Sequence, residues 1–153
     1  TVARTYRKAI DDYLESPEKY RENLEWYREE IGKCTYREFT TGFYFGKPDA
    51  ESQIYDNNTY VKNYTYLGTI EEVRPDGWCR IEQKNKFSVG EAIEVMKPDG
   101  RNVEVTVRGI TDENGIPQES APHPKQILYV DLGTELSPYD ILRRSEMDPE
   151  TEG

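Results

Sequence analysis

The chain of 153 residues fits one domain of ordinary size, or a small domain with an appendage. Only 35% of the residues are hydrophobic, but 12 Tyr, 4 Phe and 2 Trp supply large rings, so we expect one modest core rich in aromatics. The net charge of −10 is spread evenly, at −3 over residues 1–60, −3 over 61–144 and −4 over 145–153. This balance disfavours tight, autonomous binding to RNA or DNA, which requires a basic face.

The two cysteines, Cys34 and Cys79, stand far apart and in no metal-ligand spacing. We expect them to be free thiols in a reducing cytoplasm. No stretch approaches the roughly 18 apolar residues of a membrane span, and no apolar run follows the basic N-terminal residues as in a signal peptide. We therefore expect a cytoplasmic location and no membrane partner. The chain begins at Thr1 within a helical pattern and without Met, which suggests a fragment of a longer polypeptide.

Residues 1–32 are predicted to form two amphipathic helices. Apolar residues recur at helical spacing over 1–15. A second helix is expected to begin at Ser16-Pro17, an N-cap followed by a first-turn proline, and to end at Gly32. The apolar stripes are Val2, Tyr6, Ile10, Tyr13 and Leu14 on the first helix and Tyr20, Leu24, Tyr27 and Ile31 on the second. Two helices of this size cannot bury both stripes against each other alone, so we expect them to pack on another domain as well.

The rest of the chain divides into a connector, a β-rich region and a tail. Residues 33–60 are predicted to be a connector, because glycine, proline and a polar run interrupt any long element. From about residue 61 the apolar period changes to two, and glycine turns separate short segments. The predicted strands are 61–73, 78–83, 91–97, 102–110, 126–132 and 139–143.

Five or six short strands within 61–144 predict a small closed antiparallel β-barrel, since closure removes exposed strand edges. The fold class is therefore mainly β, with the barrel preceded by two α-helices. The acidic tail, 145–153, has little apolar content and is expected to be disordered.

Residues of catalytic type are few. His123 is the single histidine and lies in a proline-rich stretch. A nucleophilic Cys–His pair would need His123 beside Cys34 or Cys79, held by a third group. No glycine-rich phosphate loop, HExxH or GxSxG motif occurs. We therefore predict no catalytic residue and no metal site in this chain.

The stretch 83–101, QKNKFSVGEAIEVMKPDGR, contains the most distinctive polar cluster. Gly90 is expected to adopt a positive φ where the chain reverses. The trio Lys84, Asn85 and Lys86 has no comparable structural task, and an otherwise acidic barrel gains basic and aromatic character there. Our candidate substrate-contacting residues are Trp78, Arg80, Lys84, Asn85, Lys86 and Phe87, the last of which can also fold into the barrel mouth. The alternative is a solvated corner that keeps the surface soluble.

A second aromatic set raises the same question. Tyr60, Tyr64 and Tyr66 share one strand face by parity, and Phe43, Tyr44 and Phe45 precede them. The set is either a platform on which bases stack or part of the barrel interior. A small barrel must fill its interior from one strand face, so we favour core packing.

Longer stretches of the chain resemble known proteins. FSVGEAIEV at 87–95 resembles the strand–turn–strand of the β-barrel domain in translation elongation factors. YRKAIDDYLESPEKY, REFTTGFYFGKP, YLGTIEEVRPDGWCRIEQKNKFSVGEAIEVMKPDG and APHPKQILYVDLGTELSPYDILRR together resemble the C-terminal part of the collagenase-like peptidases. This is family thirty-two of the peptidases of unknown catalytic type, and the resemblance runs from Thr1 to about Arg144.

The resemblance implies a longer protein whose catalytic part, a TIM-type barrel with cysteines suited to an iron–sulfur cluster, lies upstream of this chain. Members are called proteases or collagenases, and some are implicated in prephenate-dependent hydroxylation of tRNA wobble uridine or of ribosomal RNA. Two cysteines cannot supply a cluster that needs about four thiolates. No catalytic residue of the family is therefore carried over, and no cofactor is expected in this chain.

Three hypotheses follow. The first is a non-catalytic accessory module that docks on its own upstream catalytic domain and presents the barrel to a macromolecular substrate, either a collagen-like protein or a structured RNA. The second is RNA binding through the patch from Trp78 to Phe87. The third is peptidase activity in the fragment itself, through Cys79 or His123.

Overall fold

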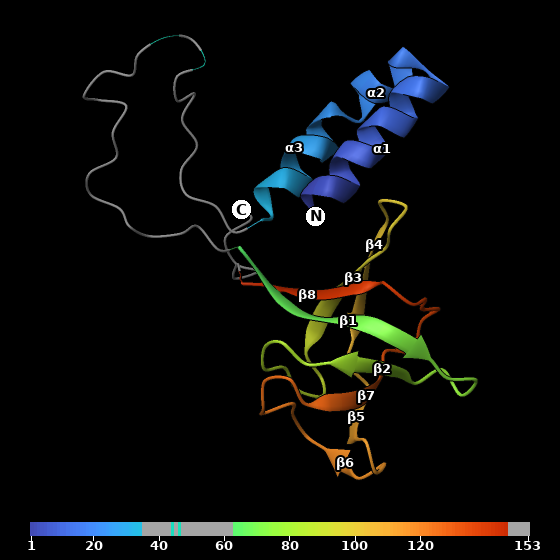
Figure 1. Ribbon diagram of the computed structural model, residues 1–153, viewed down its shortest axis with the longest axis vertical. Coiled ribbons are helices and arrows are strands. Elements are labelled where there is room, and N and C mark those ends of the chain that lie inside the picture. The colour runs from blue at the N-terminus through green and yellow to red at the C-terminus, as the bar shows by residue number, and fades with distance from the viewer. Residues whose placement is uncertain (35–43, 45, 47–62, 147–153) are drawn as a thin grey trace.

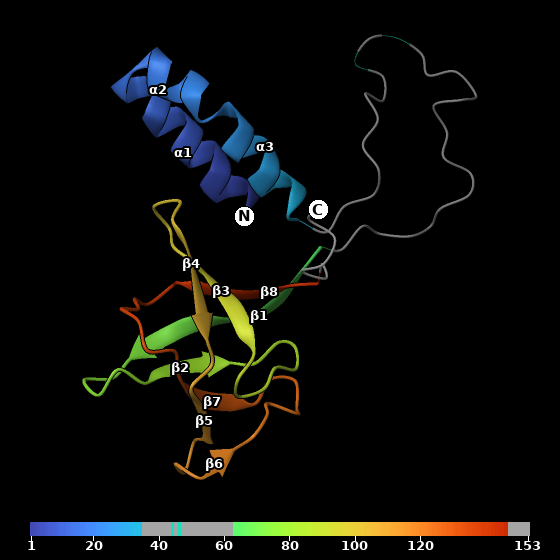
Figure 2. The ribbon, with the colours of Figure 1, turned by 180° about the vertical axis from the view of Figure 1, so that it is seen from behind.

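The computed structural model describes residues 1–34, 44, 46 and 63–146 (Figure 1). Helices lie side by side at one end of a curled β-sheet, and the view from behind shows the same arrangement (Figure 2). The predicted mainly β class, with antiparallel strands preceded by helices, is confirmed. Most of the predicted connector and the end of the predicted acidic tail lie outside the described residues.

The helical part consists of α1 (Val2–Glu15), α2 (Pro17–Glu22) and α3 (Leu24–Gly32). The predicted cap at Ser16 is confirmed, since its hydroxyl accepts a hydrogen bond of 3.1 Å from the backbone N–H of Lys19. The second predicted helix is interrupted at Asn23, whose φ of −92° and ψ of 4° depart from helical values. The Asn23 amide donates a 3.0 Å hydrogen bond to Asp12. The interruption coincides with this tie between helices.

Helix α1 turns its polar side inward. Asp12 is buried and accepts hydrogen bonds from Tyr27 at 2.7 Å and from Lys8 at 3.0 Å, in addition to Asn23. The buried residues of α1 are Thr5 and Asp12, while its predicted apolar stripe is exposed to solvent. The helices therefore pack on each other through hydrogen bonds and the rings of Tyr13, Tyr20 and Tyr27, and leave most of the apolar stripe uncovered.

The strands are β1 (Tyr64–Val73), β2 (Cys79–Glu82), β3 (Ala92–Met96), β4 (Asn102–Thr106), β5 (Gly109–Asp112), β6 (Pro117–Gln118), β7 (Ile127–Asp131) and β8 (Ile141–Ser145). They pair in the order β4-β3-β8-β1-β2-β7-β5-β6, with every named pairing antiparallel. The sheet curls into a half-barrel. Long β1 joins its two halves because it pairs with β8 on one side and with β2 on the other.

The predicted strand 102–110 is divided in two. β4 pairs with β3 in one half of the sheet, and β5 pairs with β7 in the other. Between them the N–H of Val107 donates to Glu91 and the N–H of Arg108 donates to Asp131, so the chain changes partners at this corner. Alternation of side chains cannot reveal such a change, because both segments keep the same period.

The core lies inside the curl. Its buried members include Leu67, Ile70, Ile81, Phe87, Val95, Leu128, Val130 and Leu142. This core is aliphatic with one phenylalanine, whereas the sequence predicted an aromatic-rich core. The expected positive φ of Gly90 is confirmed at 87°. The tight turns leave the strands short, so aliphatic side chains from several strands fill the small interior.

Candidate functional site

The structure divides the predicted contact residues among three locations. Trp78 precedes β2 and lies against Gly109, while Arg80 points from β2 to an ion pair with Glu71. Lys84, Asn85 and Lys86 follow the other end of β2 and are exposed. Phe87 is fully buried in the core, as its alternative role required. The three exposed residues therefore lie together, and Trp78 lies beyond the opposite end of the strand.

The exposed loop is held by backbone hydrogen bonds on both sides. The N–H of Lys84 donates to the carbonyl of Leu67 at 2.8 Å, and the side-chain amide of Asn85 donates to the carbonyl of Tyr66 at 2.7 Å. The carbonyl of Lys86 accepts a 3.1 Å hydrogen bond from Arg144. The loop thus rests on the start of β1 and the end of β8.

These contacts bring together residues that the sequence separates widely. Tyr66 pairs with Arg143, and Thr65 pairs with Arg144, across β1 and β8. Tyr66 is 42% exposed, and its hydroxyl is hydrogen-bonded to that of Thr69 at 2.8 Å. We call this surface the β1–β8 rim, and it consists of Tyr64, Tyr66, Lys84, Asn85, Lys86, Arg143 and Arg144. It joins the exposed Lys84 and Lys86, the partly exposed Arg144 and the buried Arg143 to two tyrosine rings. Lys84 is ion-paired with Glu82, and Arg144 with Glu91 and Glu146.

The positions of Tyr64 and Tyr66 differ from the prediction that these rings fill the barrel interior. Tyr64 and Tyr66 share one face of β1, as parity predicted, but their side chains lie outside the core. The residues that β1 contributes to the core are Leu67 and Ile70. The register of β1 against β8 shifts between Tyr66 and Gly68, which changes the phase of the strand. Tyr60 and the two phenylalanines of the set lie outside the described residues.

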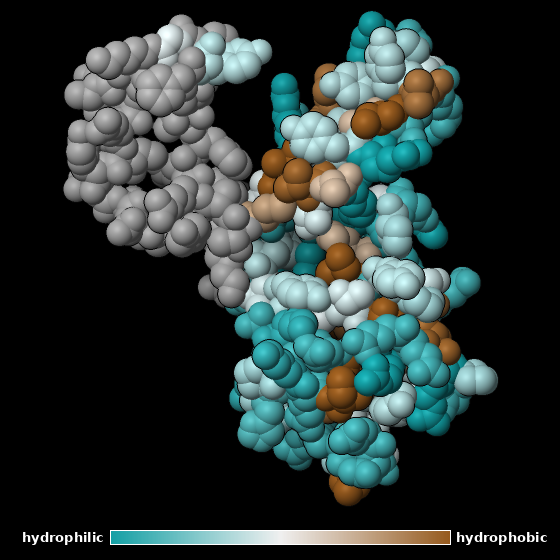
Figure 3. Space-filling view, in the orientation of Figure 1, coloured by the Kyte–Doolittle hydropathy of each residue, from teal (hydrophilic) through white to brown (hydrophobic). Residues whose placement is uncertain are grey.

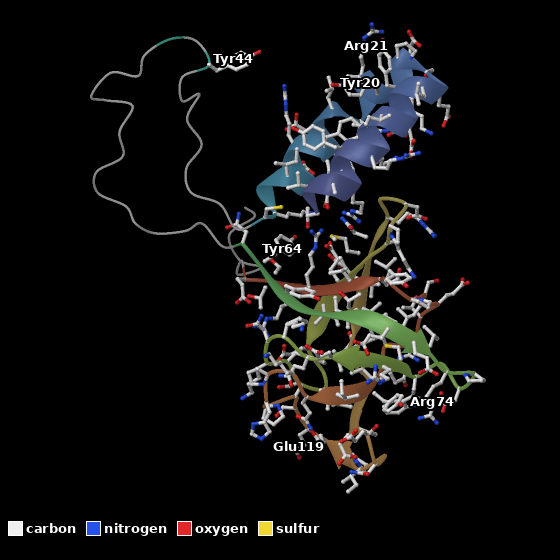
Figure 4. The ribbon with its side chains drawn as sticks, viewed as in Figure 1. Tyr20, Arg21, Tyr44, Tyr64, Arg74 and Glu119 are labelled. Carbon is white, nitrogen blue, oxygen red and sulfur yellow. The ribbon has the colours of Figure 1, made fainter. Side chains whose placement is uncertain are left out.

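A hollow of about 520 Å³ lies beside the rim, at the joint between helices and half-barrel. It is lined by Thr1, Val2, Lys33, Cys34, Tyr64, Tyr66, Asn85, Met96, Ile141 and Arg143. Tyr64 lies at this joint, beneath the end of α3 (Figure 4). The guanidinium carbon of Arg143 lies 4.7 Å from the Tyr64 ring centroid, and the Lys33 ammonium lies 5.5 Å from it. Both are cation–π distances.

A buried carboxylate, that of Glu30, pairs with the cations at this joint. Glu30 is fully buried and is contacted by Arg4 of α1, by Lys33 at 2.7 Å and by Arg143 of β8 at 3.2 Å. Asn102 of β4 adds a 2.7 Å hydrogen bond. Burial by itself would raise the pKa of Glu30, but the Lys33 hydrogen bond and the charges of Arg143 and Arg4 outweigh it, and the pKa lies below its ordinary value.

We name this group the Glu30 clamp: Arg4, Glu30, Lys33, Glu94, Asn102 and Arg143. Arg143 also pairs with Glu94 of β3, so the clamp ties both helices of the joint to three strands. Sequence reasoning missed it. Its members are spread from residue 4 to residue 143, and each looks like an ordinary polar surface residue in its own segment.

The residues of catalytic type lie apart. Cys79 is buried between strands, and burial, with a smaller effect of the Asp131 charge, raises the pKa of its thiol to about 12. A thiol in that state is a poor nucleophile. His123 lies exposed on the loop before β7. This geometry opposes the hypothesis of a Cys79–His123 hydrolase.

The described residues also fit no iron–sulfur cluster. One thiol is enclosed in the core with Val130 as its hydrogen-bond partner, while Cys34 lines the hollow. Within residues 1–34 and 63–146, no group of three His, Cys, Asp or Glu side chains is arranged to hold a metal ion. We derive no chemistry through a cluster in this chain. None of the described helices has the length and apolar character needed to cross a bilayer.

The described residues form a β-rich module preceded by a helical segment. Residues 62–143 match the Peptidase family U32 C-terminal domain, and residues 1–54 match Peptidase family U32. The chain therefore belongs to peptidase family U32, as its sequence motifs indicated.

Two curated relatives carry names that refer to RNA. The chain is 31% identical over 147 residues to tRNA hydroxylation protein P1 of Bacillus subtilis (strain 168), covering 95% of this chain and 35% of that protein. It is 27% identical over 146 residues to tRNA hydroxylation protein P of Escherichia coli (strain K12), covering 94% and 31%. The chain thus spans about a third of the length of these relatives.

Solved structures of similar domains are known from Geobacillus thermoleovorans. The crystal structure of a U32 peptidase C-terminal domain is 29% identical, with a TM-score of 0.48, and covers 54% of this chain and 92% of that one. Its selenomethionine variant is 28% identical, with a TM-score of 0.49, and covers 52% and 99%.

Proposed function

We propose that this chain is a non-catalytic accessory module of a tRNA-hydroxylating enzyme and that its β1–β8 rim contacts the tRNA. The observation that carries the proposal is the convergence of Lys84, Lys86 and Arg144 with the exposed ring of Tyr66 on one surface. Cations that neutralise phosphates and rings that stack on bases are the two components of single-strand RNA binding. The names of the two curated relatives favour RNA over a collagen-like protein as the macromolecular substrate.

The acidic balance of the chain sets the expected strength of this contact. With a net charge of −10, the chain by itself is expected to bind tRNA weakly and to lose affinity steeply as salt rises. The rim would then position an RNA that the rest of the longer protein also holds. The iron–sulfur chemistry and the hydroxylation belong, in this proposal, to the catalytic part outside this chain.

Charge reversal on the rim tests the RNA contact. In the full-length protein, Lys84→Glu with Lys86→Glu is expected to weaken tRNA binding about tenfold or more at low salt and to flatten the dependence of affinity on salt. The control is Arg21→Glu with Arg28→Glu, which makes the same charge change on exposed helical positions; Arg21 lies at the far end of the helices (Figure 4). Equal affinities of the rim variant and the unmodified protein at low salt would refute the proposal.

We also propose that the helices attach the module to its own upstream catalytic domain. The exposed face of α1 carries Val2, Tyr6, Ile10, Tyr13 and Leu14, and a groove of about 430 Å³ runs between this stripe and Tyr20. Hydrophobic side chains gather on the helices in the space-filling view (Figure 3). A contiguous apolar surface of this kind is typical of an interface. The match of residues 1–54 to the family itself supports the catalytic domain as the partner.

Hydrogen exchange tests this attachment. Amides of α1 are expected to exchange more slowly in the full-length protein than in this chain alone, because docking covers the helix. Ile10→Asp with Leu14→Asp is expected to abolish that added protection while leaving the isolated chain folded, since both side chains are exposed in it. Identical α1 exchange in the full-length protein and the isolated chain would exclude docking through this face.

A further inference from the structure

We propose that the hollow beside the rim takes one unstacked nucleotide of single-stranded RNA, with its base against Tyr66 and its phosphate toward Lys33 and Arg143. This inference rests on the proposed RNA contact and specifies which part of the RNA is held. The hollow, at about 520 Å³, falls within the size range of small-ligand sites. It opens directly beside Lys84 and Lys86, because Asn85 belongs both to the loop and to the lining.

The aromatic wall is fixed in position. The Tyr66 hydroxyl is tied to Thr69, and its carbonyl is tied to Asn85, while the ring stays 42% exposed. Tyr64 is flanked by the cations of Arg143 and Lys33. A ring that is already ordered loses little entropy when a base stacks on it, so these tyrosines are suited to sequence-tolerant stacking.

The charge of the Glu30 clamp, which shares Lys33 and Arg143 with the lining of the hollow, favours an anion. Three cations, Arg4, Lys33 and Arg143, meet two carboxylates, Glu30 and Glu94, so the Glu30 clamp has a local charge of +1 within an acidic chain. Among the described residues, the buried Nη1 of Arg143 has no hydrogen-bond partner, while its Nε and Nη2 are occupied. The two N–H donors of this nitrogen are therefore unused in a side chain that lines the hollow. A phosphate group is a suitable acceptor for a buried guanidinium.

The geometry selects single-stranded RNA. A base inside a duplex keeps its stacking neighbours and cannot enter a hollow, whereas a base in a loop is readily turned out of the stack. The rim cations can contact the phosphates on either side of the inserted nucleotide. The site therefore combines one stacking position with a flanking phosphate track.

The test compares a ten-nucleotide single strand with the same strand in a duplex, using the full-length protein. Tyr66→Ala is expected to weaken single-strand binding about tenfold, the order of one lost base–aromatic stack, and to leave duplex binding unchanged. The matched control, Tyr66→Phe, keeps the ring and is expected to bind within about twofold of the unmodified protein. A 5-iodouridine strand irradiated on the unmodified protein is expected to crosslink to Tyr66 or Tyr64.

The outcomes separate this inference from the function on which it rests. If charge reversal at Lys84 and Lys86 weakens binding but Tyr66→Ala does not, and the crosslink maps elsewhere, the nucleotide site is refuted and the RNA contact stands. If neither set of variants changes RNA affinity, both are refuted. Binding of a collagen-derived peptide that Tyr66→Ala abolishes, in a protein with no RNA affinity, would assign the hollow to a protein ligand and would also refute both.

Discussion

The interior of the half-barrel and the joint between half-barrel and helices are stabilised by different forces. The interior is apolar, with Leu67, Ile81 and Leu142 fully buried. The joint is organised around the buried carboxylate of Glu30, which cations reach from helix and strand. Apolar packing has no direction, whereas a buried charge is stable only when its partners are all in place. The comparison indicates a stable barrel core joined to its helices by a charge-dependent and orientation-specific contact.

Removing core volume should give the largest effect. Leu142→Ala is expected to reduce the free energy of unfolding by about 4 kcal/mol, because Leu142 is fully buried in the middle of the sheet. Urea unfolding followed by circular dichroism measures the loss. The control is Val89→Ala at a 41% exposed position, expected to change stability by less than about 0.5 kcal/mol. A loss below about 1 kcal/mol for Leu142→Ala would contradict the assigned role of the interior.

Removing the charge at the joint should be the next largest effect. Glu30→Gln keeps the shape of the side chain but leaves Arg4 and Arg143 buried beside a neutral group, at an expected cost of about 3 kcal/mol. The helices should loosen before the strands unfold, seen as faster hydrogen exchange in α3 than in β2. Glu25→Gln, an exposed change on the same helix, is the control. Uniform loss of protection in helices and strands would show that the joint does not act as a separate unit.

Acid should act on the joint and on the contacts between the helices, and spare the core. The pKa values of Glu30 and Asp12 lie below their ordinary values of 4.5 and 3.8, so the unfolded chain binds protons more readily and stability falls as pH decreases. The stability that these groups contribute is present above about pH 5 and is lost as pH falls through their folded pKa values. Urea unfolding between pH 7 and pH 3 measures the slope.

The same pair of variants makes the pH experiment specific. Glu30→Gln is expected to show a shallower slope than the unmodified protein, since one carboxylate with a lowered pKa is removed. Leu142→Ala is expected to keep the full slope, because the core side chain does not titrate. Parallel slopes in all three proteins would mean that Glu30 gains no stability from its buried partners.

Chemical labelling of the two cysteines is the smallest perturbation of the protein. It compares the two regions directly, because Cys79 lies in the core and Cys34 lies at the joint. Cys79 is buried in the core with a thiol pKa raised to about 12, and Cys34 is partly exposed at the joint. A thiol reagent at pH 7.5 is expected to modify Cys34 rapidly and Cys79 only after denaturation. Mass spectrometry of peptides after timed labelling measures both rates. Comparable labelling of the two thiols in the native protein would mean that the core opens as readily as the joint.

Much of the fold could be predicted from the sequence because its signals are local. The cap at Ser16 and the turn at Gly90 depend on neighbouring residues alone, and both were predicted correctly. The same holds for the period-two pattern of most strands. In the candidate site, the residues from Lys84 to Lys86 lie together in an exposed loop. The predicted grouping of this trio with Trp78 is not observed, because strand β2 separates them.

The remainder depended on contacts between distant segments. Tyr66 faces outward because β1 changes register against β8. Arg143 becomes part of the rim and the hollow only when β8 pairs with β1. Glu30 is buried only because the helices and strands meet around it. A single glutamate in a helical sequence pattern does not indicate such a contact.

By itself the sequence determined most of the helices and strands, several of the turns between them, the family resemblance and the apolar stripe on the first helix, since each depends on neighbouring residues or on composition. Only the tertiary structure decided that this stripe remains exposed, that a buried carboxylate joins helices to barrel, and that tyrosines and cations share a hollow. The physical reason is that backbone conformation responds to local sequence, while burial and charge pairing depend on which distant segments the fold brings into contact.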